Sequence, residues 1–164
     1  MPETSTVAAV RCGTFIVEGN TSMATTSTAR TAWHGSLTEG SGTTSLVTSG
    51  AGTFDMTWQK RAESGSGGTN PEELLAAALA TCYSMALSNA LSKAGTPPTS
   101  LDTTVDVTFQ PGTGITGAKI AVVGSVPGID EGAFKAAAEK TKTDCPVSQA
   151  LSGIEKTLEV SFQA

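Results

Sequence analysis

The feature that most constrains the fold is a long stretch rich in alanine and leucine in the middle of the chain, residues 72–93. Asn70 can cap a helix, Pro71 suits the first helical position, and Glu73 completes a pattern like a capping box. Gly95 is a typical residue at the end of a helix. Most faces of this helix are apolar, so we expect it to be buried, and its alanines permit the close approach of another helix.

Segments of alternating polarity flank this helix and predict strands on both sides of it. The expected elements before it are strands over residues 30–38, 43–48 and 53–59, which form an antiparallel meander, and a loop over 61–69. The expected elements after it are a hairpin of residues 103–110 and 115–123, a helix from 130 or 131 to about 142, a short helix over 146–151 and a last strand around 158–162. The sequence therefore predicts an α+β fold.

Composition excludes several functional classes. The 164 residues suffice for one domain with a core, and the formal net charge is −5 with no cluster of lysine or arginine. Neither charge nor aromatic content favours binding to nucleic acid. No apolar run approaches the roughly 18 residues of a membrane span, and three cysteines do not form a paired disulfide framework. We therefore expect a cytoplasmic protein with free or catalytic thiols.

The N-terminal region differs from the rest of the chain. Residues 1–28 are rich in serine and threonine and show no period, so we expect a disordered extension, followed by a domain over 29–164. The apolar stretch at residues 7–10 is too short for a secretory signal. Met23 offers a second start, and Cys12, upstream of it, is interpreted as an incidental surface thiol.

Two cysteines have settings that suggest chemistry. Cys82 lies in the middle of the long helix, where a thiol alone would normally be a packing residue. Cys145 lies at the predicted start of the short helix, where partial positive charge favours a thiolate. The pair suggests thiol redox chemistry.

The segments around these cysteines resemble the OsmC/Ohr family of thiol-dependent peroxidases, and its OsmC branch in particular. The resemblance extends from about Thr31 to Phe162. It is densest in Gly68-Thr69-Asn70-Pro71-Glu72-Glu73-Leu74, Cys82-Tyr83-Ser84-Met85-Ala86-Leu87-Ser88 and Cys145-Pro146-Val147-Ser148-Gln149-Ala150-Leu151, with Pro127-Gly128-Ile129-Asp130 between them.

The resemblance implies a fold and an activity. The expected fold is an intertwined homodimer in which antiparallel sheets wrap around long central helices, with each active site at the subunit interface. The expected activity reduces organic hydroperoxides, including lipid-derived ones, to alcohols. A small dithiol or a dithiol-bearing protein would supply the electrons, and no metal, flavin or haem would take part.

The resemblance also implies roles for four residues. Cys82 corresponds to the cysteine that attacks the peroxide and becomes a sulfenic acid, and Cys145 to the one that resolves it as a disulfide. Arg61 is the candidate partner of the Cys82 thiolate, since a guanidinium stays charged and can also hold a peroxide oxygen. Glu72 corresponds to the acidic residue that orients this arginine. Alternatively, Arg61 is a solvated loop residue and Glu72 a first-turn carboxylate.

The spacing of Glu72 and Cys82 bears on the oligomeric state. Ten residues on one helix correspond to about 15 Å of rise, too far for one arginine to bridge within a chain. An antiparallel partner helix could bring Glu72 of one subunit near Cys82 of the other. If both residues share one arginine, the spacing favours a dimeric site.

Other residues keep two interpretations. Five could line an apolar pocket for the tail of the peroxide or could be core residues: Leu75, Leu79, Tyr83, Met85 and Phe134. His34 is the single histidine, and its spacing from the cysteines matches no zinc site, so we expect a strand residue facing solvent. A Cys82–His34 hydrolase lacks a third orienting residue.

The alternative to an enzyme is a non-enzymatic, stress-related module of the same fold that binds apolar ligands. The presence of both cysteines favours the enzyme. A redox-sensing regulator would need an element that reads DNA, and the sequence suggests none.

Overall fold

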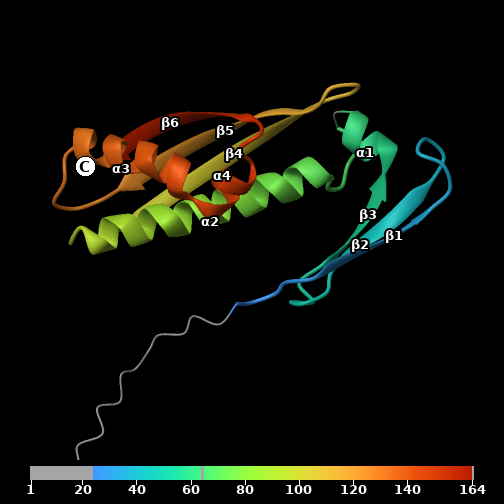
Figure 1. The fold of residues 1–164 in the computed structure, drawn as a ribbon, viewed down its shortest axis with the longest axis horizontal. Coiled ribbons are helices and arrows are strands. Elements are labelled where there is room, and N and C mark those ends of the chain that lie inside the picture. Colours follow the sequence, from blue (N-terminus) through green and yellow to red (C-terminus); the bar gives the residue numbers. More distant parts are fainter. Residues whose placement is uncertain (1–23, 64, 164) are drawn as a thin grey trace, which may run out of the picture.

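The computed structural model describes residues 24–63 and 65–163, so the expectations for the first 23 residues, Cys12 included, lie outside it. The elements are β1 (Ala29–His34), β2 (Ser41–Leu46), β3 (Thr53–Thr57), α1 (Trp58–Ala62), α2 (Pro71–Lys93), β4 (Ser100–Gln110), β5 (Gly114–Ser125), α3 (Glu131–Asp144), α4 (Pro146–Ala150) and β6 (Glu155–Gln163). They form two separate three-stranded sheets and a group of helices, which confirms the predicted α+β class (Figure 1).

The larger part of the molecule is a body made of β4, β5, β6 and the helices α2, α3 and α4. β4 and β5 pair antiparallel as the predicted hairpin, and β6 then pairs parallel with β5. A parallel pair needs a crossover connection, which α3 and α4 provide. These two helices lie with α2 over one face of the sheet (Figure 1), and α2 contacts β4, α3 and α4.

The core lies between this sheet and the helices. Its fully buried side chains include Leu79, Tyr83 and Leu87 of α2, Ile120 of β5 and Phe134 of α3. The Phe134 ring lies over Gly124 so closely that a Cβ there would overlap it, and it packs against Phe162 with ring centroids 5.5 Å apart. Close packing of this kind explains why β5 carries a glycine at the point where α3 crosses it.

The ends of α2 follow the predicted signals. Asn70 caps the helix, because its side-chain oxygen accepts a hydrogen bond from the Glu73 amide at 2.8 Å. Gly95, with φ of 83°, follows the last turn in the left-handed conformation that favours glycine. Asp130 caps α3 in the same way as Asn70 caps α2, by accepting from the Ala133 amide at 2.7 Å.

The smaller part of the molecule is the N-terminal sheet, β1–β2–β3, which lies beyond the N-terminal end of α2 and away from the body (Figure 1). Its strand register places Thr31 opposite Thr44 and Thr44 opposite Phe54, so these residues share one face. Trp33 and Met56 belong to the same face by the period of two. Trp33 is 38% exposed there, so one chain leaves this apolar face partly uncovered.

The structure differs from the sequence prediction around α1. A strand was expected as far as residue 59 and a loop from 61, but β3 ends at Thr57 and a short helix follows. The Thr57 side chain accepts a hydrogen bond from the Lys60 amide at 3.3 Å and so caps this helix. The Trp58 ring then packs edge-on against Phe109, with centroids 6.2 Å apart. This tertiary contact with β4 outweighs the local preference for a strand.

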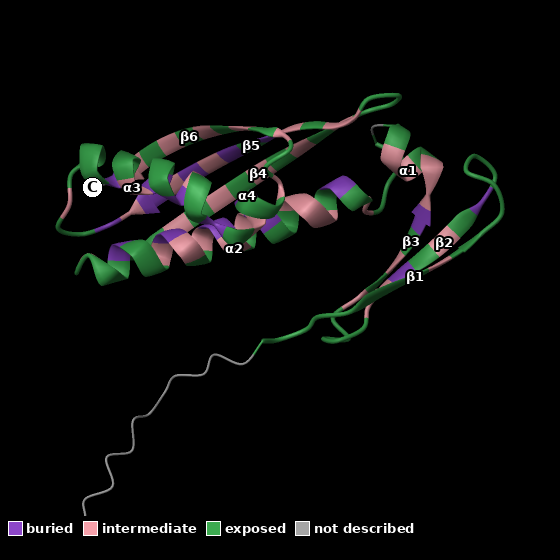
Figure 2. Cartoon of the chain, viewed as in Figure 1, coloured by how far each residue is buried: buried purple, intermediate pink, exposed green. Residues whose placement is uncertain are grey.

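The helix α2 is also less buried than the sequence predicted. Its buried side chains follow one face, and the opposite face of alanines and Met85 stays open (Figure 2). Met85 is 68% exposed. In the part of the chain that the structure describes, α2 is the one helix long and apolar enough to cross a membrane. The prediction of a buried helix was wrong for one chain alone, because the elements that the structure describes leave this face of α2 open.

Candidate active site

The structure brings Cys82 and Cys145 together, although 62 residues separate them along the chain. Cys82 lies on α2 and is half-buried, whereas Cys145 is fully buried at the junction where α3 ends and α4 begins. The contact between α2 and α4 brings the two thiols close enough for Cys145 to raise the pKa of Cys82. Both thiols are free. A disulfide between these two thiols would link the middle of α2 to the start of α4.

The surroundings of Cys82 act in two directions on its ionisation. Burial raises the pKa of the Cys82 thiol, the backbone N–H of Val147 in α4 lowers it, and the neighbouring Cys145 raises it again. The net result is a raised pKa, because desolvation disfavours the thiolate more than one N–H favours it. Within one chain, Cys82 is therefore a weak nucleophile at neutral pH, and a nearby cation would be needed to activate it.

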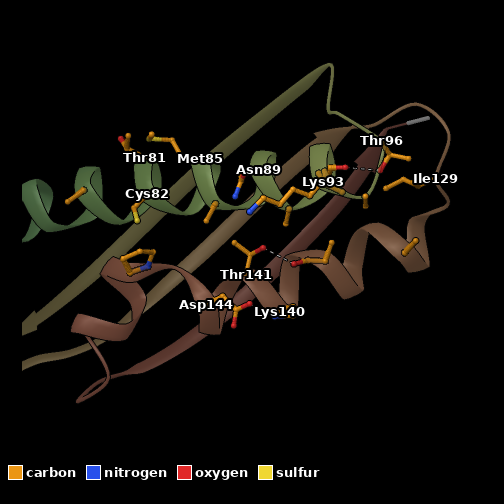
Figure 3. Close-up of a pocket in the computed structure, with 18 of the residues that line it drawn as sticks. Thr81, Cys82, Met85, Asn89, Lys93, Thr96, Ile129, Lys140, Thr141 and Asp144 are labelled. Atoms are coloured by element: carbon orange, nitrogen blue, oxygen red, sulfur yellow. Dashed lines mark hydrogen bonds and ion pairs between the residues drawn. The ribbon is translucent and has the colours of Figure 1, made fainter. Parts of the chain in front are cut away.

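Cys82 opens onto a groove between α2 and α3, with a volume of about 1380 Å³ (Figure 3). One wall is α2, from Ala77 to Ala94, and the other is α3, with Pro146 beside Cys82. Figure 3 shows Thr81, Cys82, Met85 and Asn89 along α2, with Thr141 and Asp144 on the opposite side. Alanine and methionine make the α2 wall mostly apolar.

Arg61 and Glu72 form a second cluster at the N-terminal end of α2. The Arg61 Nη2 and Nε donate to Glu72 Oε1 at 2.8 and 3.1 Å, and Nε also approaches Oε2 at 3.3 Å. The guanidinium lies over the Phe109 ring, with Cζ 4.2 Å from its centroid. Glu72 is only 5% exposed, and this forked pair fixes the guanidinium with its outer side open.

These two clusters stay apart within one chain. Glu72 and Cys82 are ten residues apart on α2, which corresponds to about 15 Å along the axis. Arg61 lines a different hollow, of about 330 Å³, together with Trp33 and Met56 of the N-terminal sheet and Leu74 of α2. The structure therefore pairs Arg61 with Glu72 and Cys82 with Cys145, and among the described residues no cation contributes to the pKa shift of Cys82.

The five candidate pocket residues separate into two groups. Leu79, Tyr83 and Phe134 are fully buried in the core of the body, and the Tyr83 hydroxyl donates to the Ala138 carbonyl at 3.0 Å. Met85 does line the groove beside Cys82. Leu75 is half-buried and lines neither of the two hollows described above.

His34 lies outside both clusters, whereas Phe109 contacts Arg61. His34 is exposed at the end of β1, as expected, and does not line the Cys82 groove. Phe109, under the Arg61 guanidinium, was not predicted. It is an apolar residue in the alternating pattern of β4, as core residues of strands usually are, so nothing in the sequence indicated its contact with Arg61.

Comparison with known proteins agrees with this architecture. A family model described as OsmC-like protein matches residues 63–160. Peroxiredoxin OsmC of Escherichia coli is 42% identical over 135 residues, which cover 80% of this chain and 93% of that protein. The chain belongs to the OsmC-like family, as the sequence motifs predicted.

Solved structures give the same result for the fold. The crystal structure of an organic hydroperoxide resistance protein OsmC from Legionella pneumophila superposes with a TM-score of 0.62 at 26% identity. The superposition covers 84% of this chain and 97% of the Legionella pneumophila chain. The structure of OhrB from Bacillus subtilis superposes with a TM-score of 0.57 at 22% identity, covering 83% and 98% of the two chains. Both parts of the molecule therefore belong to a fold found in other OsmC and Ohr proteins.

Proposed function

We propose that this protein reduces organic hydroperoxides to alcohols with Cys82 and Cys145, and that a dithiol returns the two cysteines to the reduced state. The observation that carries the proposal is that Cys82, at the wall of an apolar groove, meets the buried free thiol of Cys145 from a different element. The names of relatives, Peroxiredoxin OsmC and organic hydroperoxide resistance protein, describe the same chemistry and support it.

The proposed cycle has three steps. The Cys82 thiolate attacks the terminal oxygen of the hydroperoxide, the O–O bond breaks, and the alkoxide takes a proton to leave as the alcohol. Cys82 is then a sulfenic acid, which Cys145 attacks to form the Cys82–Cys145 disulfide and water. A small dithiol or a dithiol-bearing protein reduces the disulfide and becomes oxidised itself. The cycle needs no metal, flavin or haem.

We further propose that the working form is an intertwined homodimer with Arg61 of one subunit beside Cys82 of the other. Three observations support a second copy: the open apolar face of α2, the partly uncovered face of the N-terminal sheet, and the separation of Arg61 from Cys82 within one chain. A guanidinium near the sulfur would lower the pKa of Cys82, against the effect of burial. An antiparallel arrangement of two α2 helices in such a dimer would account for these three observations.

The first experiment measures consumption of cumene hydroperoxide with dithiothreitol as the reductant. We expect turnover in the wild type, its loss in Cys82→Ser, and its loss or severe slowing in Cys145→Ser. A reagent specific for sulfenic acids should label Cys82 in Cys145→Ser. Cys12→Ser is the matched control and should keep wild-type turnover. Equal turnover in all four proteins, or none in any, would contradict the proposed function.

The groove supports one alternative. Its size and apolar wall also suit a non-enzymatic module that binds an apolar ligand. Such a module would bind fatty acids equally well in wild type and in Cys82→Ser and would leave hydroperoxides intact. For the peroxidase we propose a cytoplasmic location, because thiols stay reduced there.

A further inference from the structure

Ser148 has a feature that the proposed cycle does not yet explain. Its side chain is only 2% exposed. Among the residues that the structure describes, its Oγ is the buried side-chain oxygen or nitrogen that has no hydrogen-bond partner. Leaving a buried hydroxyl unpaired is unfavourable, and such exceptions in folded proteins usually have a functional cause.

The place of Ser148 points to Cys145 as the missing partner. Cys145 is the N-cap residue of α4 and Ser148 is the third residue of that helix. These two positions share the first turn of the helix, and in a capping box the side chain of the third residue reaches back toward the N-cap residue. Cys145 makes no side-chain capping bond. The Ser148 hydroxyl is thus a polar group in this first turn that lacks a partner.

Ser148 does not bond the usual local partner of a helical serine. A serine within a helix can donate to the carbonyl four residues earlier, here that of Asp144. That carbonyl instead accepts from Gln149 Nε2 at 3.2 Å. Because Ser148 is buried by its own chain, neither a substrate in the groove nor a second subunit can reach its hydroxyl.

In the dithiol state the Ser148 hydroxyl does not bond the Cys145 sulfur. A neutral thiol is a weak acceptor, whereas a thiolate accepts strong, charge-assisted hydrogen bonds. We propose that the Ser148 hydroxyl donates a hydrogen bond to the Cys145 sulfur when that sulfur is a thiolate. This inference rests on the proposed two-cysteine cycle.

The bond would act in both steps that involve Cys145. In the first, the Cys145 thiolate attacks the Cys82 sulfenic acid and the S–O bond breaks. The leaving hydroxide takes up the proton that Cys145 lost when it became a thiolate, which gives water. In the second, one thiolate of the dithiol attacks the disulfide at Cys82, which lines the groove, and Cys145 leaves as a thiolate before it is protonated. Cys145 itself is fully buried and offers no path for that attack. Ser148 keeps its own proton throughout.

The test follows disulfide formation in a single turnover of Ser148→Ala, in a Cys12→Ser background. One equivalent of cumene hydroperoxide is added without reductant, and the reaction is quenched in acid and followed by mass spectrometry. We expect peroxide consumption at the wild-type rate and disulfide formation slowed by about tenfold, the size expected for one hydrogen bond to a charged atom. The pH profile of disulfide formation should move to higher pH.

Other titratable groups near the two thiols are the same in both proteins. They include Tyr83 and Lys93 from α2 and Glu139, Lys140 and Asp144 from α3. The difference between the two pH profiles therefore reports on Ser148.

A second measurement separates this role from a structural one. The Ser148 hydroxyl has no partner in the reduced protein, so Ser148→Ala should melt no lower than the wild type. The matched control is Ser84→Ala, whose hydroxyl bonds Ala80 O at 2.9 Å and Thr103 Oγ1 at 2.8 Å. This control should melt lower and form the disulfide at the wild-type rate.

Two outcomes would overturn the inference: an unchanged disulfide rate and pH profile in Ser148→Ala, or a lower melting temperature with an unchanged pH profile. The second would show a structural role, such as binding a buried water. If the wild type consumes no peroxide, the proposed function fails by itself. Diamide, an azo oxidant that takes up the two hydrogens of the dithiol, then forms the same disulfide and tests Ser148 independently.

Discussion

The body and the N-terminal sheet differ in how much of their structure one chain can complete. The body buries Tyr83, Phe134 and Ile120 completely between three strands and three helices. The N-terminal sheet has a comparable apolar face, but Met56 is the one large apolar side chain there that its own chain buries, at 8% exposure. The contacts of Trp58 and Arg61 with Phe109 join the two parts.

This difference corresponds to a division of the chemistry. The body holds both thiols, whereas the arginine comes from α1, next to the N-terminal sheet. The part that is complete in one chain thus carries the redox pair, and the part that is incomplete carries the candidate activating cation. In our proposal, a second copy completes the sheet and brings its Arg61 to Cys82 at the same time.

The largest expected effect concerns the body. Phe134→Ala removes a fully buried ring that packs on Gly124 and Phe162, so we expect it to cost about 3–5 kcal/mol of unfolding free energy. Urea denaturation followed by circular dichroism measures this loss. Phe134→Leu is the control and should recover most of it. A loss below about 1 kcal/mol for Phe134→Ala would show that the body is not the self-sufficient part.

A smaller effect is expected at the N-terminal sheet. Trp33 has few neighbours in its own chain, but in our proposal it meets a second copy. We expect Trp33→Ala to weaken self-association by about tenfold or more, as is typical of a tryptophan at an interface. Sedimentation velocity over a dilution series measures the change, and exposed Leu37, replaced by alanine, is the comparison. Unchanged association in Trp33→Ala would mean that this face does not meet a second copy.

The smallest expected effect joins the two parts. Burial raises the pKa of Cys82, and a nearby guanidinium would lower it, so removing the guanidinium should let the pKa rise. In Arg61→Gln we expect the midpoint of the pH dependence of Cys82 alkylation to move upward by about one unit. Arg30→Gln, on the exposed surface of β1, is the matched control. An unchanged midpoint in Arg61→Gln would show that the arginine acts elsewhere.

Local signals predicted much of the body. Asn70, Pro71 and Gly95 set the limits of α2 almost to the residue, because capping depends on side chains close in sequence. The hairpin, α3 and the position of Cys145 at a helix start followed from similar signals. The helix positions of Cys82 and Cys145 suggested a redox pair, and the resemblance of the surrounding motifs to a known family assigned a role to each cysteine.

Features that depend on tertiary contacts could not be predicted. α1 forms where alternation indicated a strand, because Trp58 packs against Phe109 from a distant strand. The parallel pairing of β6 with β5 is a long-range choice that strand patterns do not encode. The unpaired hydroxyl of Ser148 was also invisible, since its burial depends on how α4 docks on the body.

The single helix that carries both Glu72 and Cys82 fixes the distance between them along its axis and also the angle between them around it. Each residue inserted between them would lengthen it by only about 1.5 Å but would turn Cys82 by about 100° around the axis. One insertion would therefore point the thiol away from Cys145, although the distance to the arginine would hardly change. Seven added residues would nearly restore the direction but would place the thiol about 10 Å too far along. Orientation, more than length, limits how this segment can change while both halves of the proposed site remain aligned.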